Sequence, residues 1–218
     1  MRIIEGVLFE PVGCLAEFPA DEFNEIAARL FGRRKSASKS GSRSYWHLLN
    51  LIQAADRKLD ASARKILETL EVQAVDGASS YDDVMPALSE LKAMGIKQVV
   101  TSSLSQMAVM RFLEKFVLND FFSEVWNRDN AGGIKAFPLA SAIDSASFKP
   151  EQVMFLTDTA EGLKVSKAVG VNSILMMNDP AEAMRLAMHD PAGGIVSLHE
   201  LPDFIRLVAA ENARLPHP

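Results

Sequence analysis

The sequence predicts an α/β fold whose parallel, doubly wound sheet carries the functional site at one edge. From residue 81 to near the end of the chain, short apolar runs alternate with segments in which apolar residues recur every three or four positions. Strands that alternate with helices in this way are typical of parallel sheets with helical crossovers. Several runs also end on an acidic or hydroxyl residue, where open α/β sheets bind their ligands.

Composition narrows the class of protein. The 218 residues fit one large domain or a core with an inserted subdomain, and 48% of them are hydrophobic, which is ample for a core. A net charge of −5 argues against a nucleic-acid partner, and no apolar segment approaches the ~20 residues that span a bilayer. Cys14 is the single cysteine, so a reducing, cytoplasmic location is expected. Composition does not predict an oligomeric state.

The first strand candidate is the apolar run Val7–Phe9, which ends on Glu10 and breaks at Pro11 and Gly13. A buried strand that stops on a carboxylate and then turns is where open α/β sheets place their chemistry. The rest of the chain is interpreted around this stretch.

Residues 17–80 are expected to be helical. Apolar residues recur at helical spacing in 18–31, 45–55 and 66–72, and none of these segments has the pattern of a strand. We therefore predict that residues 17–80 form a small helical subdomain inserted after the first strand. Residues 1–16 and 81–218 are expected to form the α/β core.

The segment 33–43 holds five cations and no anion among small polar residues. This composition favours a solvent-exposed loop, and the alternative is an electropositive lid edge that meets an anionic substrate. His47 lies beside Trp46 in the next apolar stripe. It is interpreted as a packing or surface residue, because no acid or hydroxyl partner lies at motif spacing.

In the α/β part, Gly95 and Gly170 each follow a helical segment and mark the end of the helix. The expected strands are 96–100, 124–126, 153–156, 173–176 and 195–196. The expected helices are 84–91, 107–116, 135–146, 162–169, 180–188 and 201–210.

The stretch Phe9–Leu15 resembles the first motif of the haloacid dehalogenase superfamily, an apolar strand followed by Asp-x-Asp-Gly-Thr-Leu. It keeps the Phe, the Gly and the Leu of that motif. Glu10 stands where the family has its nucleophilic Asp, and Val12 stands where most members have the acid/base Asp. The frame of the motif is intact while its reactive residues differ.

Three later segments resemble the remaining motifs of the same family, in the same order. Thr101 and Ser102 end a strand, as in its second motif, and Lys135 matches the Lys of the third. Asp158 ends a strand before a helix rich in Ala and Gly, which is most similar to the beta-phosphoglucomutase-like branch, although Thr157 replaces its Glu. The alternative, another flavodoxin-like domain, needs all four matches to be chance.

The resemblance implies a Rossmann-like core with a helical cap, and phosphoester hydrolysis or phosphoryl transfer on small metabolites. By position, Glu10, Thr101 and Lys135 would be catalytic, and Thr101, Ser102 and Lys135 would bind the phosphate. Asp158 and Glu10 would hold Mg²⁺, which neutralises charge on the phosphoryl group. The expected partner is a small phosphorylated or anionic metabolite.

The departures from the motif predict weak or absent phosphatase activity. Glu10 is one methylene longer than Asp, which moves its oxygens by roughly 1.5 Å, and Val12 cannot carry a proton. Loss of carboxylates also predicts weakened Mg²⁺ binding. The alternatives are a non-catalytic phosphometabolite-binding or regulatory protein, and an enzyme with rearranged chemistry. Cys14 could replace the nucleophile, but a buried packing residue is favoured.

Overall fold

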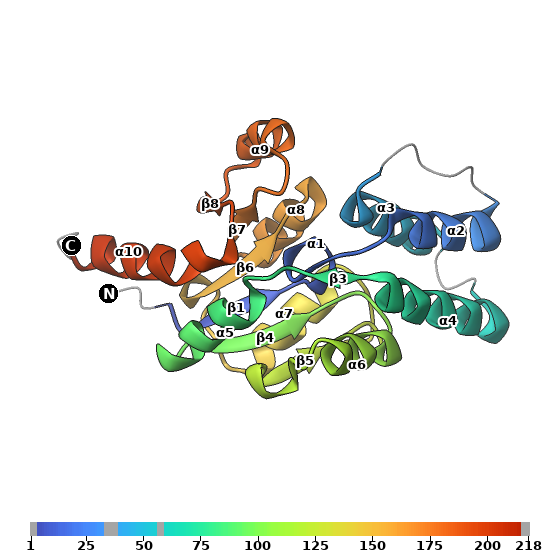
Figure 1. Ribbon diagram of the computed structural model, residues 1–218, viewed down its shortest axis with the longest axis horizontal. Helices are drawn as coiled ribbons and strands as arrows, with labels where there is room; N and C mark the ends of the chain where they lie inside the picture. The colour runs from blue at the N-terminus through green and yellow to red at the C-terminus, as the bar shows by residue number, and fades with distance from the viewer. Residues whose placement is uncertain (1–3, 33–38, 56–58, 215–218) are drawn as a thin grey trace.

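The computed structural model describes residues 4–32, 39–55 and 59–214, and its centre is a parallel sheet of six strands in the order β5-β4-β1-β6-β7-β8 (Figure 1). The strands are β1 (Gly6–Phe9), β4 (Lys97–Thr101), β5 (Glu124–Trp126), β6 (Val153–Thr157), β7 (Asn172–Met176) and β8 (Gly193–Ile195). The predicted parallel sheet is confirmed. Because β1 lies between β4 and β6, the residues that follow these strands meet at one edge.

Helices cover both faces of the sheet and gather at one end of it. They are α1 (Pro11–Cys14), α2 (Ala20–Phe31), α3 (Gly41–Ala54), α4 (Ala61–Gly77), α5 (Val84–Ala93), α6 (Gln106–Lys115), α7 (Ala136–Ser145), α8 (Ala160–Val169), α9 (Pro180–Leu186) and α10 (Leu201–Arg214). Among the residues that the structure describes, no helix is long and apolar enough to cross a membrane.

The alternation along β1 explains the three layers. Successive strand side chains point to opposite faces. Val7 and Phe9 belong to a buried cluster with Leu88 of α5, whereas Leu8 packs in a separate cluster with Leu139 of α7. Burying both faces of the central strand requires helices on each side, which confirms the doubly wound α/β/α arrangement.

Helices α2, α3 and α4 follow β1 in the chain and lie together at one end of the molecule (Figure 1). A short antiparallel pair, β2 (Ala16–Glu17) with β3 (Ser79–Ser80), joins the start and the end of this helical segment. The sequence did not predict this pair, because each strand has only two residues. The pair supports the division at residues 17–80, which stays a proposal.

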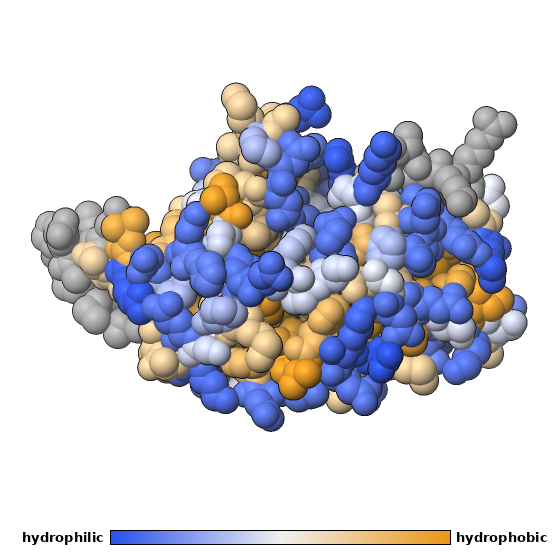
Figure 2. All heavy atoms as spheres, in the orientation of Figure 1, coloured by the Kyte–Doolittle hydropathy of each residue, from blue (hydrophilic) through white to orange (hydrophobic). Residues whose placement is uncertain are grey.

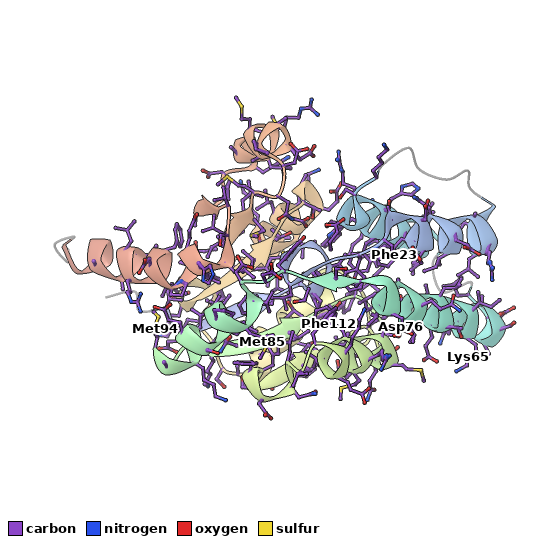
Figure 3. All side chains as sticks on the ribbon, in the orientation of Figure 1. Phe23, Lys65, Asp76, Met85, Met94 and Phe112 are labelled. Carbon is purple, nitrogen blue, oxygen red and sulfur yellow. The ribbon has the colours of Figure 1, made fainter. Side chains whose placement is uncertain are left out.

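Aromatic contacts connect the helical segment to the rest of the core. Phe18 stacks on Phe23 of α2 at 5.9 Å between ring centroids and on Phe112 of α6 at 5.8 Å. Figure 3 shows Phe23 and Phe112 near the junction of these elements. Buried aromatic pairs add roughly 0.5–1.5 kcal/mol beyond their burial, so the helices are packed onto the core and not merely tethered to it.

The basic segment 33–43 is helical at its end. Residues 33–38 lie outside the described residues, but Gly41–Arg43 form the first turn of α3, where the loop prediction was wrong. Ser40 explains the difference, because its Oγ accepts a hydrogen bond from the Arg43 backbone N–H and caps the helix. On the face shown in Figure 2, hydrophilic residues predominate and hydrophobic ones form scattered patches.

Candidate active site at the carboxyl edge of the sheet

The central strand delivers Glu10 to the carboxyl edge of the sheet. Glu10 follows β1 and caps α1, and Val12 and Gly13 then depart from helical geometry. Gly13 has a φ of +82°, and a Cβ atom there would overlap Ser42 Oγ and Asp158 Oδ2. Only glycine fits this turn without strain, and the turn is what brings β1, α3 and the end of β6 into contact.

The Glu10 carboxyl is enclosed and hydrogen-bonded on both oxygens. Only 4% of the surface of Glu10 is exposed. Oε1 accepts a hydrogen bond from Ser102 Oγ at 2.8 Å and one from the Val12 backbone N–H at 3.5 Å, and Oε2 accepts one from Tyr45 at 3.4 Å. Burial raises the pKa of Glu10 to about 8. The carboxyl is therefore mainly protonated at neutral pH, which makes it a poor nucleophile.

Tyr45 of α3 closes the site over Glu10. Its side chain is fully buried, and its hydroxyl accepts a hydrogen bond from the Ser103 backbone N–H at 2.9 Å while lying 3.4 Å from Ser102 Oγ. Burial raises the pKa of Tyr45, so the phenol stays protonated. The sequence placed Tyr45 in an apolar stripe, and only the fold reveals that its polar end meets Glu10.

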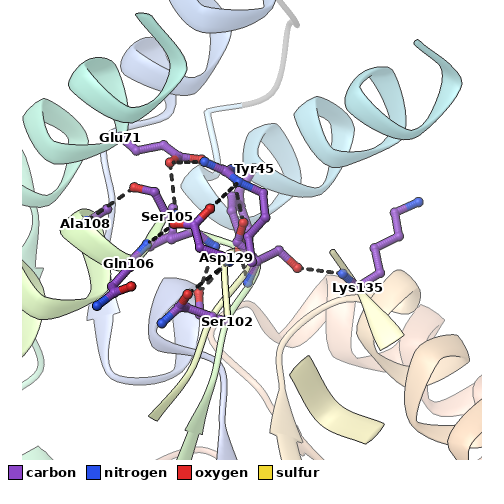
Figure 4. Close-up of polar contacts among 12 residues, drawn as sticks. Tyr45, Glu71, Ser102, Ser105, Gln106, Ala108, Asp129 and Lys135 are labelled. Carbon is purple, nitrogen blue, oxygen red and sulfur yellow. Dashed lines mark hydrogen bonds and ion pairs between the residues drawn. The ribbon is translucent and has the colours of Figure 1, made fainter. Parts of the chain in front are cut away.

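The two hydroxyl residues at the end of β4 differ in their contacts. Ser102 donates to Glu10, and Figure 4 labels it in the same cluster of polar contacts as Tyr45. Thr101 is buried, and its Oγ1 has no hydrogen-bond partner in the described parts of the chain. Ser102 thus lies at the carboxyl group, whereas Thr101 offers its hydroxyl to nothing in this arrangement.

Lys135 reaches the same loop by its backbone but directs its side chain elsewhere. Its N–H donates to Ser103 Oγ at 2.7 Å, and its Nζ donates to Asn50 at 2.5 Å and to Gln53 at 2.7 Å, both on α3. In Figure 4 the side chain extends away from Ser102. Desolvation lowers the pKa of Lys135. Its φ of +63° is strained for a residue with a Cβ.

Asp158 follows β6, adjacent to β1, and is partly exposed. Its Oδ2 accepts a hydrogen bond from Ser42 Oγ at 2.6 Å and one from Asn178 Nδ2 at 3.3 Å. Desolvation raises the pKa of Asp158 to about 6. The structure therefore brings Glu10 and Asp158 to neighbouring strand ends, as the motif order predicted, with α3 contacting both.

A cavity of about 580 Å³ opens between α3 and the loops that carry Asp158 and Asn178. Trp46 and His47 line it from α3, together with Arg43, whose guanidinium pairs with Glu182 at 3.1 Å. Glu10, Ser102 and Lys135 are not among the residues that line this cavity. Of the residues singled out from the four motifs, Asp158 is one that lines this cavity.

Cys14 is placed as a packing residue. It is fully buried and its Sγ donates to the Leu156 carbonyl oxygen at 3.5 Å. Burial, with the nearby carboxyl groups, raises the pKa of the thiol well above its usual value. Since the thiolate is the nucleophile, this environment disfavours catalysis by Cys14.

A buried ion pair supports the loop after β4. Arg128 donates to Glu71 of α4 at 2.6 and 3.0 Å and also to the Ser103 carbonyl oxygen at 3.3 Å. Glu71 is fully buried and accepts a further hydrogen bond from the Ser105 N–H (Figure 4). The sequence contains no local signal for this pair, because its members are 57 residues apart.

The acidic residues present do not fit a Mg²⁺ site. Mg²⁺ prefers near-octahedral oxygen ligands at about 2.0–2.1 Å, usually with carboxylates and several waters. Across residues 4–32, 39–55 and 59–214 no group of three His, Cys, Asp or Glu residues is placed to hold a metal. Glu10 and Asp158 already accept hydrogen bonds from side chains of α3. At the positions of the remaining motif carboxylates stand Val12 and Thr157.

Comparisons with known proteins agree on the fold. A family model described as "Haloacid dehalogenase-like hydrolase" matches residues 33–176, a range that begins after Glu10 and Val12. No curated protein matches the chain.

Solved structures with low sequence identity resemble the chain over most of its length. A haloacid dehalogenase-like hydrolase from Streptococcus pneumoniae is 14% identical at a TM-score of 0.70, with 94% of this chain and 99% of that chain covered. A putative haloacid dehalogenase-like hydrolase from Bacteroides fragilis is 20% identical at a TM-score of 0.71, covering 90% and 99%. A predicted phosphoglycolate phosphatase from Haemophilus somnus is 15% identical at 0.66, covering 94% and 98%.

Proposed function

The chain belongs to the haloacid dehalogenase-like hydrolase family, and from this premise we propose that it is a member with weak or absent ordinary phosphatase activity. Residues 17–80 would act as its helical cap, and residues 1–16 and 81–218 as its core. The proposed location is the cytoplasm, on the basis of composition.

The state of Glu10 carries the proposal. An in-line attack on phosphorus needs an ionised, accessible carboxylate. Glu10 is 4% exposed, with a pKa of about 8 and hydrogen bonds from Ser102 and Tyr45. A phosphoryl group cannot reach it without displacing Tyr45. The longer side chain adds a misplacement, and about 1 Å can cost on the order of a hundredfold in rate.

The proton carrier is also missing. Val12 is fully buried and has no titratable group, and loss of general acid–base help costs roughly 10²–10⁴-fold. Mg²⁺ would neutralise phosphoryl charge if it were bound, but the donor set at Glu10 and Asp158 does not match its needs. The proposal therefore includes no step through a metal ion.

The proposed ligand is a small phosphorylated or anionic metabolite. The family supports this class, as does the printed name of the Haemophilus somnus neighbour, a phosphoglycolate phosphatase. The cavity at Asp158 has room for such a molecule, and His47 and Arg43 lie on its α3 wall. Ser102, Thr101 and Lys135 remain the candidate phosphate contacts once Tyr45 has moved.

A second candidate is a non-catalytic binding or regulatory protein. It is favoured by the separation of the cavity from Glu10, because a ligand can occupy the space at Asp158 without contacting the position of the family nucleophile. The two candidates differ in turnover and not in binding.

The experiment compares hydrolysis of p-nitrophenyl phosphate by the native chain and by the double variant Glu10→Asp, Val12→Asp. We expect native turnover barely above background. The double variant restores the nucleophile and the proton carrier, so we expect a partial gain, roughly tenfold or more. The single variant Val12→Asp is the matched control, because it restores the proton carrier without shortening Glu10. Thermal melting verifies that each variant is folded.

Native turnover comparable to that of ordinary phosphatases, abolished by Glu10→Ala, would show that Glu10 is a working nucleophile. In that case the proposed loss of activity is wrong. Binding of inorganic phosphate without turnover in the native chain, unchanged in Glu10→Ala, supports the binding protein over the weak hydrolase.

A further inference from the structure

We infer that Ser42 of α3 takes the place of a divalent metal ion on Asp158, so that this carboxyl group is held without a metal. The inference concerns the same two carboxyl groups as the proposed function, Glu10 and Asp158. It depends on their hydrogen bonds and not on the catalytic turnover of the protein.

The first observation is the occupancy of the Asp158 carboxyl. Ser42 Oγ donates to Oδ2 at 2.6 Å, an ordinary distance for a hydroxyl–carboxylate hydrogen bond, and Asn178 Nδ2 donates to the same atom at 3.3 Å. Both donors place hydrogen atoms against Oδ2, one of the two oxygens that a cation could use. The two hydrogen bonds stabilise the Asp158 carboxylate where the family chemistry uses a metal.

The second observation is the lack of space beside that oxygen. A single carbon added at Gly13 would overlap both Ser42 Oγ and Asp158 Oδ2. The backbone of the Gly13 turn therefore lies against the hydrogen-bonded pair. An ion with its waters cannot enter on this side unless α3 moves.

The third observation is that Glu10 offers no second free ligand. Ser102 and the Val12 N–H occupy Oε1, and Tyr45 occupies Oε2. At the other motif position, Thr157 Oγ1 lies against Thr159 and would overlap any Cβ at residue 162. Each of the two carboxyl groups thus accepts a hydrogen bond from a side chain of α3.

The position of Ser42 is built into the backbone. Ser40 caps the first turn of α3, and a Cβ at Gly41 would overlap the Phe18 carbonyl oxygen. The helix therefore begins in close contact with the chain that enters α2, and this contact fixes Ser42, one residue later, at Asp158. The hydroxyl is held in place before any ligand arrives, which reduces the ordering cost of binding.

The test measures metal binding directly, by the effect of Mn²⁺ on water proton relaxation and by calorimetry with MgCl₂. The variants are Ser42→Ala and the control Ser44→Ala, a buried serine of the same helix whose hydroxyl has no hydrogen-bond partner among the described residues. We expect no saturable binding by the native chain or by Ser44→Ala. Ser42→Ala frees Asp158 and should bind Mn²⁺ saturably, and Ser42→Ala with Asp158→Asn should lose that binding.

A parallel calorimetric titration uses inorganic phosphate with and without Mg²⁺. The native chain should give the same phosphate affinity, within a factor of two, in both conditions. Ser42→Gly replaces Ser42→Ala if the latter fails to fold by circular dichroism.

Saturable Mn²⁺ binding by the native chain that disappears in Asp158→Asn would overturn the inference. So would a Ser42→Ala variant that is folded and binds no more metal than the native chain, because the hydroxyl would then not be what excludes it. Neither result bears on whether Glu10 hydrolyses phosphoesters, so this test and the test of the proposed function fail separately.

Discussion

The two carboxyl groups at the edge of the sheet follow neighbouring strands, yet they lie in opposite settings. Glu10 is enclosed by Tyr45 and Ser102 and has no access to the cavity, whereas Asp158 lines it. The pKa of Glu10 is raised to about 8 and that of Asp158 to about 6, in each case chiefly by desolvation.

The difference between the two sides arises from what supports them. On the Glu10 side, the loop after β4 is held by the Glu71–Arg128 ion pair, and Tyr45 bonds to the same loop. On the Asp158 side, single hydrogen bonds from Ser42 and Asn178 border open space. The cavity lies on the Asp158 side, which has fewer supporting contacts, and Glu10 does not line it.

The largest effect is expected from removing the Glu71–Arg128 ion pair, which supports the loop after β4. Replacing Glu71 by Gln leaves the buried Arg128 charge without its partner, and breaking such a pair costs roughly 3–5 kcal/mol. Urea unfolding of Glu71→Gln measures this loss in the free energy of unfolding. The Glu10 side should lose order before the Asp158 side, as seen by amide hydrogen exchange in β4 and β6.

Asp76→Asn is the matched control. Asp76 also lies on α4 (Figure 3) and pairs with Arg111 of α6 at 2.8 Å, but both side chains are exposed. Exposed pairs contribute about 0.2–1 kcal/mol. Equal losses for the two variants would mean that burial does not distinguish these ion pairs.

The pH dependence of the free energy of unfolding should also distinguish Glu10 from Asp158. The folded chain holds the protons of Glu10 and Asp158 more tightly than the unfolded chain, whose values are near 4.5 and 3.8. The free energy of unfolding is therefore highest below those values and falls as pH rises, up to about 8 for Glu10 and about 6 for Asp158. Glu10→Gln should remove a decline of roughly a few kcal/mol.

Chemical denaturation at pH 4, 6 and 8 separates the two carboxyl groups. Asp158→Asn should flatten the curve only between pH 4 and 6, and Glu10→Gln should flatten it over the whole interval. If Glu10→Gln leaves the decline between pH 6 and 8 unchanged, Glu10 is not the group that holds its proton there.

The smallest expected effect is at the phenol that seals Glu10. Tyr45→Phe removes the acceptor of the buried Ser103 N–H, and an unmade buried hydrogen bond costs about 1–3 kcal/mol. Thermal unfolding measures the change. The control is Tyr81→Phe. The Tyr81 hydroxyl donates to the Gly13 carbonyl oxygen and to the exposed Glu17 and does not contact Glu10. A smaller loss for Tyr45→Phe than for Tyr81→Phe would contradict a sealed Glu10 side.

Much of the fold follows from local patterns in the sequence. The apolar runs at Val7–Phe9 and 153–156 mark buried strands, and parallel order places their ends together, so Glu10 and Asp158 could be brought to one edge from the sequence. What the sequence did not contain was the direction of long side chains. Lys135 matches its motif, yet its ammonium group contacts Asn50 and Gln53.

The contacts from the helical segment could not be predicted either. Ser42 lay in a stretch interpreted as a loop, and Tyr45 was placed in an apolar stripe because periodicity reports which face is buried and not what a hydroxyl meets there. Arg128 and Glu71 carry no motif, and only tertiary packing brings the loop after β5 to α4. These features depend on tertiary contacts between segments far apart in the chain.

The Glu71–Arg128 pair also limits which substitutions these two positions can accept during evolution. Because each residue leaves an unpaired buried charge if the other is replaced, a single substitution passes through a destabilised intermediate. Replacing both residues together avoids the unpaired charge, although it still removes the partners of the Ser105 N–H and of the Ser103 carbonyl oxygen. Sequences descended from this chain should accordingly retain both residues or replace both, so the two positions should co-vary despite a separation of 57 residues.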